Sequence, residues 1–379
     1  MLDFLLVLLV AYFAYLGTMM LYFELKTRGD NYFSLPLAER RNLRAKIQKH
    51  ARFIYPFFAL VSKAFRLRKF PVIRYRGVTG PLMMSSKKSY KFTYNYQPQS
   101  NDIFIATQMK CGTTWMQQIV FEVLHRGKGD LSDEGYRHMY ALSPWIETTP
   151  TSSVPFERAK LVGEKNSRII KTHMPASLCP HSDKAKYIYV TRHPVSCFAS
   201  CFDFFHLLVG PLAPDRDEMI KWFCSEDMLW GSWPTHVEGW WRRAEEHNNV
   251  LFVHYESMKK DLPGAVRKVA DFLEMDLSAE EIDQVVHRSS FEYMKEHEEH
   301  FSMFSPNIFS ESLKSVRFMQ AGTLERYKDV SDTGSQFIMD FCRERLKGGH
   351  YPLETFYPDS KSLPVHDDQV ERVEMSNVL

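Results

Sequence analysis

Residues 101–127 read NDIFIATQMKCGTTWMQQIVFEVLHRG, and this stretch decides the fold class. Its apolar run at 103–107 is short and uncharged, which is typical of a buried strand. From Thr113 onward the apolar residues fall near one helical face, and Gly127 supplies a stop signal. The stretch therefore predicts a strand, a loop and a helix in that order.

The loop between this strand and this helix carries groups that bind anions. Lys110 supplies a positive charge, Gly112 lets the backbone approach a ligand closely, and Thr113 and Thr114 offer hydroxyl donors. The free N–H groups and the dipole at a helix start attract negative charge. The lysine precedes the glycine and the first glycine of G-x-x-x-x-G-K-[ST] is absent, so a nucleotide kinase is disfavoured. The loop predicts an anion site, with a plain strand-to-helix turn as the alternative.

Later apolar runs end in polar residues in the same way. One delivers Lys171 and His173, which emerge on one face because strand positions two apart point the same way. The next delivers Arg192, with Ser200 about two helical turns beyond it, and a third ends at Tyr255. Apolar runs that alternate with helical patterns predict an α/β fold with a central, largely parallel sheet. Ligands of such sheets bind at the carboxyl ends of the strands, so these residues predict one shared site.

The composition is that of a globular chain with a hidden charge asymmetry. The 379 residues are 44% hydrophobic and carry a net charge of +2, and the mean hydropathy is −0.33. These values exclude a wholly disordered chain, a disulfide-dense mini-domain and a polytopic transporter. Between Lys26 and Lys69, twelve Lys or Arg residues face two acids, a net +10, so the remainder of the chain carries −8.

The amino-terminal residues predict attachment to a membrane. Residues 4–23 contain no charged side chain, and a helix of ~20 residues spans about 30 Å, the thickness of a hydrocarbon core. We expect an uncleaved, single-pass transmembrane anchor, the alternative being a cleaved signal peptide. The cations that follow predict a catalytic domain on the cytoplasmic side, with the Golgi lumen as the alternative, and membrane lipid as a partner.

A second apolar stretch, at residues 53–61, is too short to cross a membrane. It is typical of an interfacial segment that lies on the membrane. A basic helix packed on the catalytic domain is the alternative.

The six cysteines show no C-x-x-C pair and no zinc-ligand spacing. Cys197 and Cys201 lie four apart on a predicted helix and are expected to be small packing residues. There is no N-x-[ST] sequon, which fits a reducing compartment without excluding the Golgi lumen. The sequence His297-Glu298-Glu299-His300 differs from the zinc motif H-E-x-x-H and is expected to be a solvated helix face.

Five ordered motifs over roughly residues 95–345 resemble the cytosolic-type sulfotransferase family. The family's first loop reads approximately T-Y-P-K-S-G-T-T-W where residues 107–115 read TQMKCGTTW. Its K-T-H-x-P strand matches residues 171–175, and its Arg-x-Pro with a later Ser matches Arg192, Pro194 and Ser200. The stretches GSWPTHVEGWW at 231–241 and YESMKKD at 255–261 also match the family.

The resemblance implies a single three-layer domain of the P-loop-NTPase-like kind and 3′-phosphoadenosine 5′-phosphosulfate (PAPS) as co-substrate, without a metal. It implies His173 as general base, with Lys110 and Lys171 stabilising charge. The residues implied to hold the donor are Lys110, Cys111, Gly112, Thr113, Thr114, Trp115, Arg192, Ser200, Tyr255, Phe318, Met319 and Gly322. The implied acceptor is a hydroxyl or amine of a small molecule. The stretches 202–214 and 294–315 are rich in Phe, Met and Leu and indicate an apolar acceptor, with core or lid packing as the alternative. No nucleic-acid partner is expected, and the oligomeric state stays open.

One departure from the family pattern weakens the donor site. The family's last donor loop reads F-M-R-K-G, whereas residues 318–322 keep the frame with Gln320 and Ala321 in place of both cations. Arg317 and Arg326 are nearby cations that could compensate. Two alternatives therefore stay open, a lumenal carbohydrate sulfotransferase and a non-catalytic nucleotide-binding membrane adaptor.

The sequence divides into four expected parts. They are a transmembrane anchor at 1–25, a basic juxtamembrane and interfacial segment at 26–75, a sulfotransferase catalytic domain at 76–358 and a flexible tail at 359–379.

Overall fold

The computed structural model describes residues 2–303, apart from 66, 68, 133, 134 and 151, and residues 325–358. The strands are β1 (Val72–Tyr75), β2 (Val78–Pro81), β3 (Asp102–Thr107), β4 (Arg168–Thr172), β5 (Lys186–Thr191) and β6 (Val250–His254). The helices of eight or more residues are α1 (Leu2–Thr27), α3 (Leu37–Ala64), α4 (Lys87–Asn95), α5 (Thr113–Leu124), α7 (Pro194–Val209), α8 (Arg216–Phe223), α9 (Trp233–Glu246), α11 (Leu262–Phe272), α12 (Ala279–Arg288) and α14 (Asp332–Leu346). The shorter helices are α2 (Gly29–Tyr32), α6 (Met139–Leu142), α10 (Tyr255–Lys260), α13 (Phe291–Glu296), α15 (Leu353–Phe356), η1 (Phe156–Arg158), η2 (Gly210–Leu212), η3 (Glu298–His300) and η4 (Glu325–Asp329).

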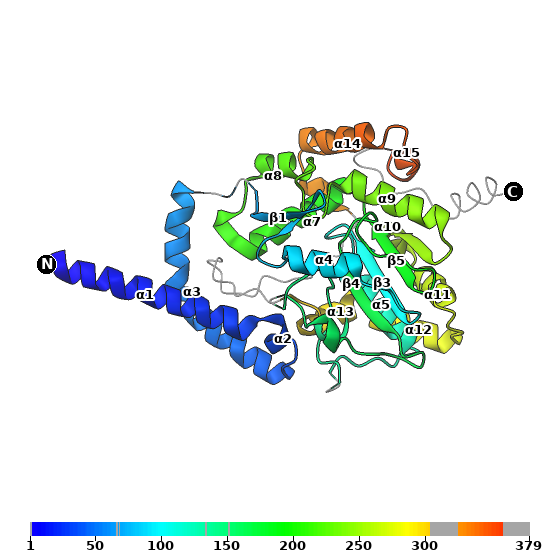
Figure 1. The fold of residues 1–379 in the computed structure, drawn as a ribbon, viewed down its shortest axis with the longest axis horizontal. Coiled ribbons are helices and arrows are strands. Elements are labelled where there is room, and N and C mark those ends of the chain that lie inside the picture. Colours follow the sequence, from blue (N-terminus) through cyan, green and yellow to red (C-terminus); the bar gives the residue numbers. More distant parts are fainter. Residues whose placement is uncertain are drawn as a thin grey trace.

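A parallel sheet of four strands, in the order β4-β3-β5-β6, forms the centre of the molecule (Figure 1). In its register Phe104 of β3 lies opposite Ile170 of β4 and Tyr187 of β5. All six residues of β3 are buried, as expected for a parallel strand with both faces covered. The α/β class and the largely parallel sheet predicted from the sequence are confirmed. A separate antiparallel hairpin, β1–β2, lies outside this sheet.

Helices cover both faces of the sheet and give it three layers. On one face Phe104 and Ala106 belong to a core cluster that also contains buried residues of α7, α9 and α14. On the other face Ile103 and Ile105 pack in a cluster with α5, α11 and α12. The strict alternation along β3 follows from the two-residue period of a strand. Cys197 lies in the first cluster, as its predicted packing role requires.

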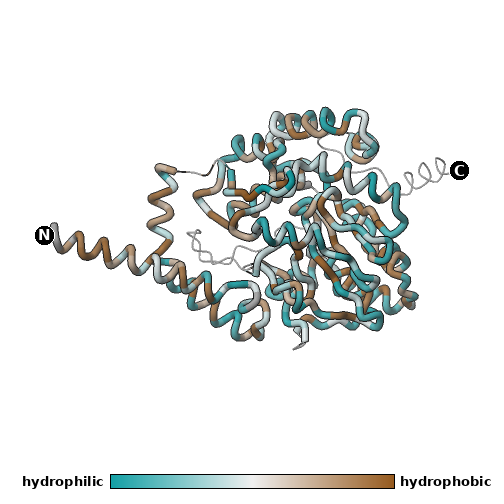
Figure 2. Tube along the Cα trace, in the orientation of Figure 1, coloured by the Kyte–Doolittle hydropathy of each residue, from teal (hydrophilic) through white to brown (hydrophobic). Residues whose placement is uncertain are grey.

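The apolar helix α1 packs along one side on α3. Leu16 and Phe23 of α1 are buried against Ile47 and Ile54 of α3, and Tyr15 Oη hydrogen-bonds His50 Nδ1 at 2.9 Å. Figure 2 shows the apolar amino-terminal part of α1 projecting away from the rest of the molecule. By length and composition, two described segments could cross a membrane, Leu6–Thr27 and Pro194–Leu212. The second includes α7, which belongs to the core.

The basic residues of α3 run beside α1 instead of following it. Lys49 and Arg52 are exposed near His50, which pairs with Tyr15, and Tyr12 Oη donates to Phe53 O at 2.9 Å. The sequence predicts an anchor followed by its cations, whereas the structure folds the cations back alongside the second half of the anchor.

The first turns of α3 dock on the catalytic domain. The buried guanidinium of Arg40 donates to Arg137 O at 2.8 Å and to Glu299 O at 3.2 Å. The exposed Arg41 pairs with the Glu299 carboxylate at 2.5 Å, and His300 is buried. The prediction that residues 297–300 form a solvated helix face is therefore wrong in part, because α3 packs against these residues. This docking matches the alternative reading of the basic segment.

The second half of α3 turns away from the first half (Figure 1). Pro56 lies inside the helix, and an internal proline removes a backbone hydrogen bond and bends a helix. The stretch 53–61 predicted to be interfacial forms this part of α3, with Phe53 and Leu60 exposed. Beyond α3 the chain reaches β1.

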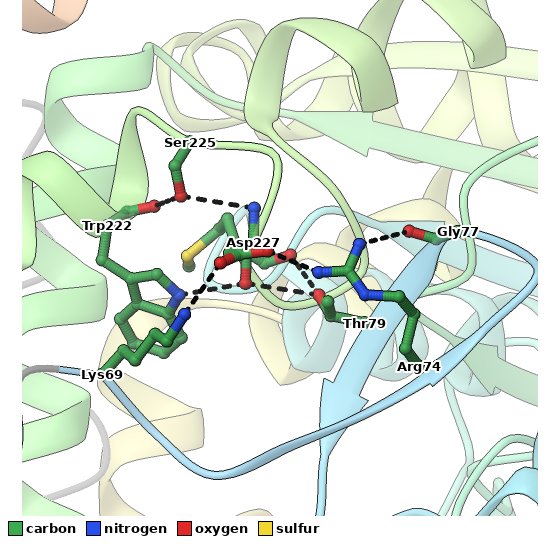
Figure 3. A network of polar contacts seen from close by, with 8 residues as sticks. Lys69, Arg74, Gly77, Thr79, Trp222, Ser225 and Asp227 are labelled. Atoms are coloured by element: carbon green, nitrogen blue, oxygen red, sulfur yellow. Dashed lines mark hydrogen bonds and ion pairs between the residues drawn. The ribbon is translucent and has the colours of Figure 1, made fainter.

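A polar network fixes the chain where it enters the catalytic domain (Figure 3). The Asp227 carboxylate pairs with Lys69 at 2.8 Å and with Arg74 at 2.5 Å. The two cations lower the pKa of Asp227 through their hydrogen bonds to it. Trp222 Nε1 donates to Asp227 O at 3.0 Å, so the network ties β1 to the loop that leads to Trp230.

The expected parts of the chain correspond to the following elements of the structure. Helix α1 extends to Thr27, two residues past the expected end of the anchor. The segment 26–75 holds α2 and α3 and ends with β1. The expected tail at 359–379 lies outside the described residues.

Candidate active site

The carboxyl ends of the parallel strands open into one cavity of about 950 Å³, here called the central cavity. Most sequence-predicted site residues line it, namely Lys110, Gly112, Thr113, Thr114, Trp115, Lys171, His173, Arg192, Ser200 and Tyr255. They come from the β3–α5 loop, from the ends of β4 and β5, from α7 and from the start of α10. Phe318, Met319 and Gly322 lie outside the described residues, as do Arg317, Gln320 and Ala321.

The β3–α5 loop requires its glycine. Gly112 has a φ of +108°, and a Cβ on it would lie 2.9 Å from Cδ2 of Tyr255. A side chain at this position would both strain the backbone and displace Tyr255. Thr113 is the first residue of α5, and the first N–H groups of a helix lack intrahelical partners. The loop thus presents backbone donors where Gly112 and Thr114 line the cavity.

Cys111 is the predicted donor residue whose side chain points elsewhere. It is fully buried, with its Sγ 3.6 Å from Cys197 Sγ on α7. Both thiols also lie near Met109 O. Cys111 is absent from the cavity lining, so its side chain packs behind the loop and only its backbone remains for a donor role.

Two lysines bring positive charge into the cavity at a desolvation cost. Burial lowers the pKa of Lys110 from 10.5 to about 8 and that of Lys171 to about 7. Lys171 Nζ lies 3.8 Å from the centroid of the Trp145 ring and donates to Tyr140 Oη at 3.1 Å. Burial disfavours the charged form of an amine unless an anion compensates it. An anionic ligand here would restore both charges.

His173 is held in the tautomer that a general base needs. Its Nδ1 lies 2.8 Å from Thr107 O. Nδ1 also lies 3.1 Å from Thr107 Oγ1, a hydroxyl that can donate or accept. Because the carbonyl oxygen can only accept, the shorter contact favours the proton on Nδ1, which leaves the lone pair of Nε2 free. Burial, together with the nearby charge of Lys171, lowers the pKa of His173 well below its usual 6.5. The ring is therefore neutral at physiological pH.

A buried carboxylate that the sequence did not reveal positions this histidine. Glu147 Oε1 accepts from the His173 backbone N–H at 2.6 Å and from Trp145 Nε1 at 2.6 Å. Glu147 Oε2 accepts from Thr172 Oγ1 at 2.9 Å. Burial raises the pKa of Glu147, although these donors oppose the rise. The carboxylate fixes the end of β4 and with it the position of the His173 ring.

Arg192 is built to receive an anion. Its guanidinium lies 4.5 Å from the centroid of the Tyr255 ring, and Nη1 lies 3.4 Å from Lys110 O. Its Nε is buried and has no hydrogen-bond partner among the described residues. An unsatisfied buried guanidinium N–H is costly, so the site fits a negatively charged ligand.

Two aromatic rings lie at the amino-terminal end of helix α5. Trp115 and Tyr255 pack edge to face, with 5.4 Å between ring centroids. Trp115 Nε1 donates to Ser289 O at 2.7 Å, which fixes the indole orientation. Both rings line the cavity and offer apolar faces for a planar ring system.

Of the two cations that could compensate for Gln320 and Ala321, the structure describes Arg326, and its charge is already paired. It lines the cavity but forms ion pairs with Asp203 and Asp329. Its compensating role for Gln320 and Ala321 would need these pairs to break.

Other residues of the site were not among the predicted site residues, although Phe204 lies in the Phe-rich stretch 202–214. Trp145 and Trp230 flank the His173 ring, with centroids 4.9 Å away in both cases. The ring of Phe204 lies 4.5 Å from Lys110 Nζ. The family-like stretch at 231–241 pointed to the neighbourhood of Trp230, but no spacing pointed to Trp145.

A cluster of possible metal ligands lies away from the central cavity. His181, Asp183 and His247 have ligand atoms within 4.8 Å of one another. They precede β5 and β6, at the opposite ends of the strands from the cavity. None of the three lines the central cavity, so the cluster has no part in this site.

Comparisons with known proteins agree with this geometry. The model of the sulfotransferase domain family matches residues 100–350. Human sulfotransferase 1C2 is 30% identical over 266 residues, covering 68% of this chain and 87% of that protein. The crystal structure of mouse sulfotransferase SULT7A1 with PAP has a TM-score of 0.53 at 22% identity, covering 73% of this chain and 95% of that one. The structure of retinol dehydratase with retinol and PAP has a TM-score of 0.55 at 22% identity, covering 70% and 87%.

Proposed function

The chain belongs to the sulfotransferase family, and from this premise we propose how its residues carry out the transfer. It is an enzyme that takes a sulfuryl group from PAPS. We propose a small, apolar molecule with a hydroxyl or amine as acceptor. In-line transfer breaks the S–O bond to the 5′-phosphate, which leaves with the nucleotide, and forms an S–O bond to an acceptor hydroxyl or an S–N bond to an acceptor amine, whose proton is removed. Such reactions ask the protein for positioning and charge stabilisation.

His173 is proposed as the general base, and the hydrogen bond from its Nδ1 to Thr107 O carries this proposal. That bond leaves the lone pair of Nε2 for the acceptor proton. The lowered pKa keeps the ring unprotonated before the reaction. Glu147 holds the His173 backbone and acts as a positioning residue.

The remaining site residues are proposed to hold the donor. Lys110 stabilises charge on the departing 5′-phosphate, and Lys171 lies on the sulfuryl side. The backbone of Cys111 and Gly112, with Thr113 and Thr114, holds the phosphosulfate. Arg192 and Ser200 are proposed to hold the 3′-phosphate, because both residues line the cavity and the buried Nε of Arg192 has no hydrogen-bond partner among the described residues. Trp115 and Tyr255 stack on the adenine, and Phe318, Met319 and Gly322 are proposed to complete the site.

The parts of the chain outside the transfer site are proposed to have the following arrangement. We propose a single three-layer catalytic domain of the P-loop-NTPase-like kind at 76–358, a basic segment at 26–75 and a flexible tail from 359. We propose that α1 attaches the enzyme to the cytoplasmic side of a membrane. A full crossing by residues 4–23 would carry Lys49 and Arg52 into the hydrocarbon beside Tyr12 and Tyr15, at about 2.5–3.5 kcal/mol each. Insertion of α1 and α3 into one leaflet avoids this cost.

The central test replaces His173 with alanine. His173→Ala should lower the turnover of sulfate from labelled PAPS by ~10²–10⁴-fold, the usual contribution of a general base. Calorimetry should show that binding of adenosine 3′,5′-bisphosphate (PAP) is unchanged, because the residues that contact the donor remain. Wild-type turnover in His173→Ala would contradict the base assignment. PAP binding by the wild type without any transfer would favour the non-catalytic adaptor.

A further inference from the structure

The central cavity extends beyond the transfer site to the helix that precedes the family match. The cavity that holds Lys110 and His173 is also lined by Met20 and Leu21 of α1. Its volume of about 950 Å³ lies at the upper end of the range for single-ligand pockets, ~300–1,000 Å³. The family match begins at residue 100, so this wall is an addition of the present chain.

The two ends of the cavity differ in chemistry. Lys110, Lys171 and Arg192 stand at the end next to α5. The part lined by α1 and its neighbours, here called the apolar arm, has mostly apolar walls and also includes three polar residues, Glu24, Thr27 and Arg28. Its apolar residues are Met20, Leu21, Phe23, Phe58, Phe70, Met83, Met84, Leu207, Leu208 and Leu212. An anionic donor is favoured at the charged end, and a hydrocarbon body is favoured in the apolar arm.

Exposed apolar side chains from distant segments meet at this arm. Met20 and Leu21 are 50% and 57% exposed, and Met83, which follows β2, is 72% exposed. Soluble monomers rarely group large exposed apolar residues in this way. Met20 and Leu21 lie in the carboxyl-terminal part of α1, a helix whose sides are largely exposed and apolar (Figure 2). The arm is therefore open toward the side of the molecule that carries the membrane helix.

The amino-terminal segment is connected to Lys171 through one intervening residue, Tyr140. Phe33, which follows α2, stacks on Tyr140 with 5.1 Å between ring centroids, and Tyr140 Oη accepts from Lys171 Nζ. Lys46, Lys49 and Arg52 are exposed on α3, where cations attract anionic lipid headgroups. The amino-terminal segment that is proposed to bind the membrane therefore also borders the transfer site.

We infer that the acceptor is an alcohol dissolved in the membrane, and that it enters the site sideways through the apolar arm from the leaflet that holds α1 and α3. Its hydrocarbon body lies along Met20, Leu21 and Leu208, and its hydroxyl reaches Nε2 of His173. The inference rests on the proposed transfer chemistry and adds the acceptor class and its route. It makes Leu21 and Met83 residues that determine specificity.

The test compares a long and a short alcohol as acceptors. The full chain is reconstituted in phosphatidylcholine–phosphatidylserine vesicles and supplied with labelled PAPS, with 1-hexadecanol in the vesicles or 1-butanol in solution. In the variants Leu21→Trp and Met83→Trp, the ratio of kcat/KM for 1-hexadecanol to that for 1-butanol should fall about tenfold, because an indole displaces several methylenes from the arm. Both residues are exposed, so the fold tolerates the larger side chain.

Leu25→Trp is the matched control. Leu25 lies one turn beyond Leu21 on α1 and is similarly exposed, at 51%, but it does not line the cavity. Its ratio should stay at the wild-type value. An unchanged ratio in Leu21→Trp and Met83→Trp, or an equal fall in Leu25→Trp, would overturn the inference.

Two further outcomes separate this inference from the proposed function. Binding of PAP without transfer to either alcohol would overturn the membrane alcohol as acceptor and leave the donor site intact. Failure of the wild type to bind PAP in calorimetry would overturn the proposed function itself.

Discussion

At the scale of single residues, the site is a place where positive charge is held at low dielectric before the donor arrives. Lys110 and Lys171 have pKa values of about 8 and about 7, well below that of an exposed lysine. A bisphosphate ligand raises both, because an opposite charge nearby favours the protonated form. Binding of PAP at neutral and alkaline pH therefore takes up protons.

This proton uptake predicts the pH dependence of PAP affinity. At pH 6 both lysines are charged with or without ligand. As the pH rises above 6, the free enzyme loses protons that the complex keeps. Between pH 7 and pH 9 the affinity should fall at least about tenfold, the value for one linked proton with a free pKa near 8. Calorimetry at several pH values, in buffers of different ionisation enthalpy, measures both the affinity and the proton number.

The control for this prediction is Lys110→Arg. A guanidinium stays protonated throughout this pH range, so the variant should take up fewer protons and show a flatter profile. An affinity that does not vary with pH in the wild type would show that the lysines stay charged without ligand.

The sequence predicted the site residues that lie next to a strand end, and it missed those that only folding brings there. Lys171 and His173 followed from a strand period. Glu147 and Trp145 reach His173 because residue 145 forms an isolated parallel bridge with Lys171, a long-range pairing that leaves no local pattern. Cys111 was placed by its position in a motif, but its thiol faces α7.

At the scale of elements, α3 joins the apolar helix α1 to the rest of the molecule through a buried arginine. Burial lowers the pKa of Arg40 to about 10, and its donors satisfy carbonyls of two separate loops. Arg41, one residue later, forms an exposed ion pair with Glu299. The two neighbours offer a direct comparison of a buried and an exposed contact.

Replacing each arginine should separate the two contributions. Arg40→Ala leaves two carbonyl acceptors unpaired and a void, and should lower the free energy of unfolding by ~2–3 kcal/mol. Arg41→Ala removes an exposed pair and should cost less than ~1 kcal/mol. Denaturant unfolding of the full chain in one detergent measures both. Equal costs would mean that Arg40 does not hold α3 on the domain.

The elements that were predicted well are those specified locally. The run at 103–107 and the helix from Thr113 appear as β3 and α5 because the apolar spacing and the glycine act within a few residues. The docking of α3 depends on Glu299, more than 250 residues away. The charge pattern of α3 fitted both a lipid surface and a protein surface, and the structure shows Arg40 and Arg41 used for contacts with protein.

At the scale of the whole molecule, the arrangement of α1 and α3 determines which side of the membrane the amino terminus occupies. A helix that crosses completely places its two ends on opposite sides. Helices that enter one leaflet keep both ends on the side of the catalytic domain.

An epitope tag at the amino terminus tests this arrangement. In intact, sealed microsomes, protease should remove both the tag and the catalytic domain, because both face the cytoplasm in the proposed arrangement. A tag that survives while the domain is digested would establish a full crossing. Protection of both, lost when detergent opens the vesicles, would establish the lumenal alternative.

The docking of α3 by Arg40 also determines which acceptor concentration controls the rate, the amount per volume of solution or the amount per area of bilayer. A catalytic domain on a flexible tether sweeps through a half-sphere of solution and meets solutes by volume. In the proposed arrangement the domain is packed against α1 and α3 in the membrane, so the cavity would stay at one height above the lipid and move only in two dimensions. Turnover would then follow the number of acceptor molecules per unit area of bilayer, and diluting the acceptor with inert lipid would slow the enzyme even when the total amount in the tube is unchanged.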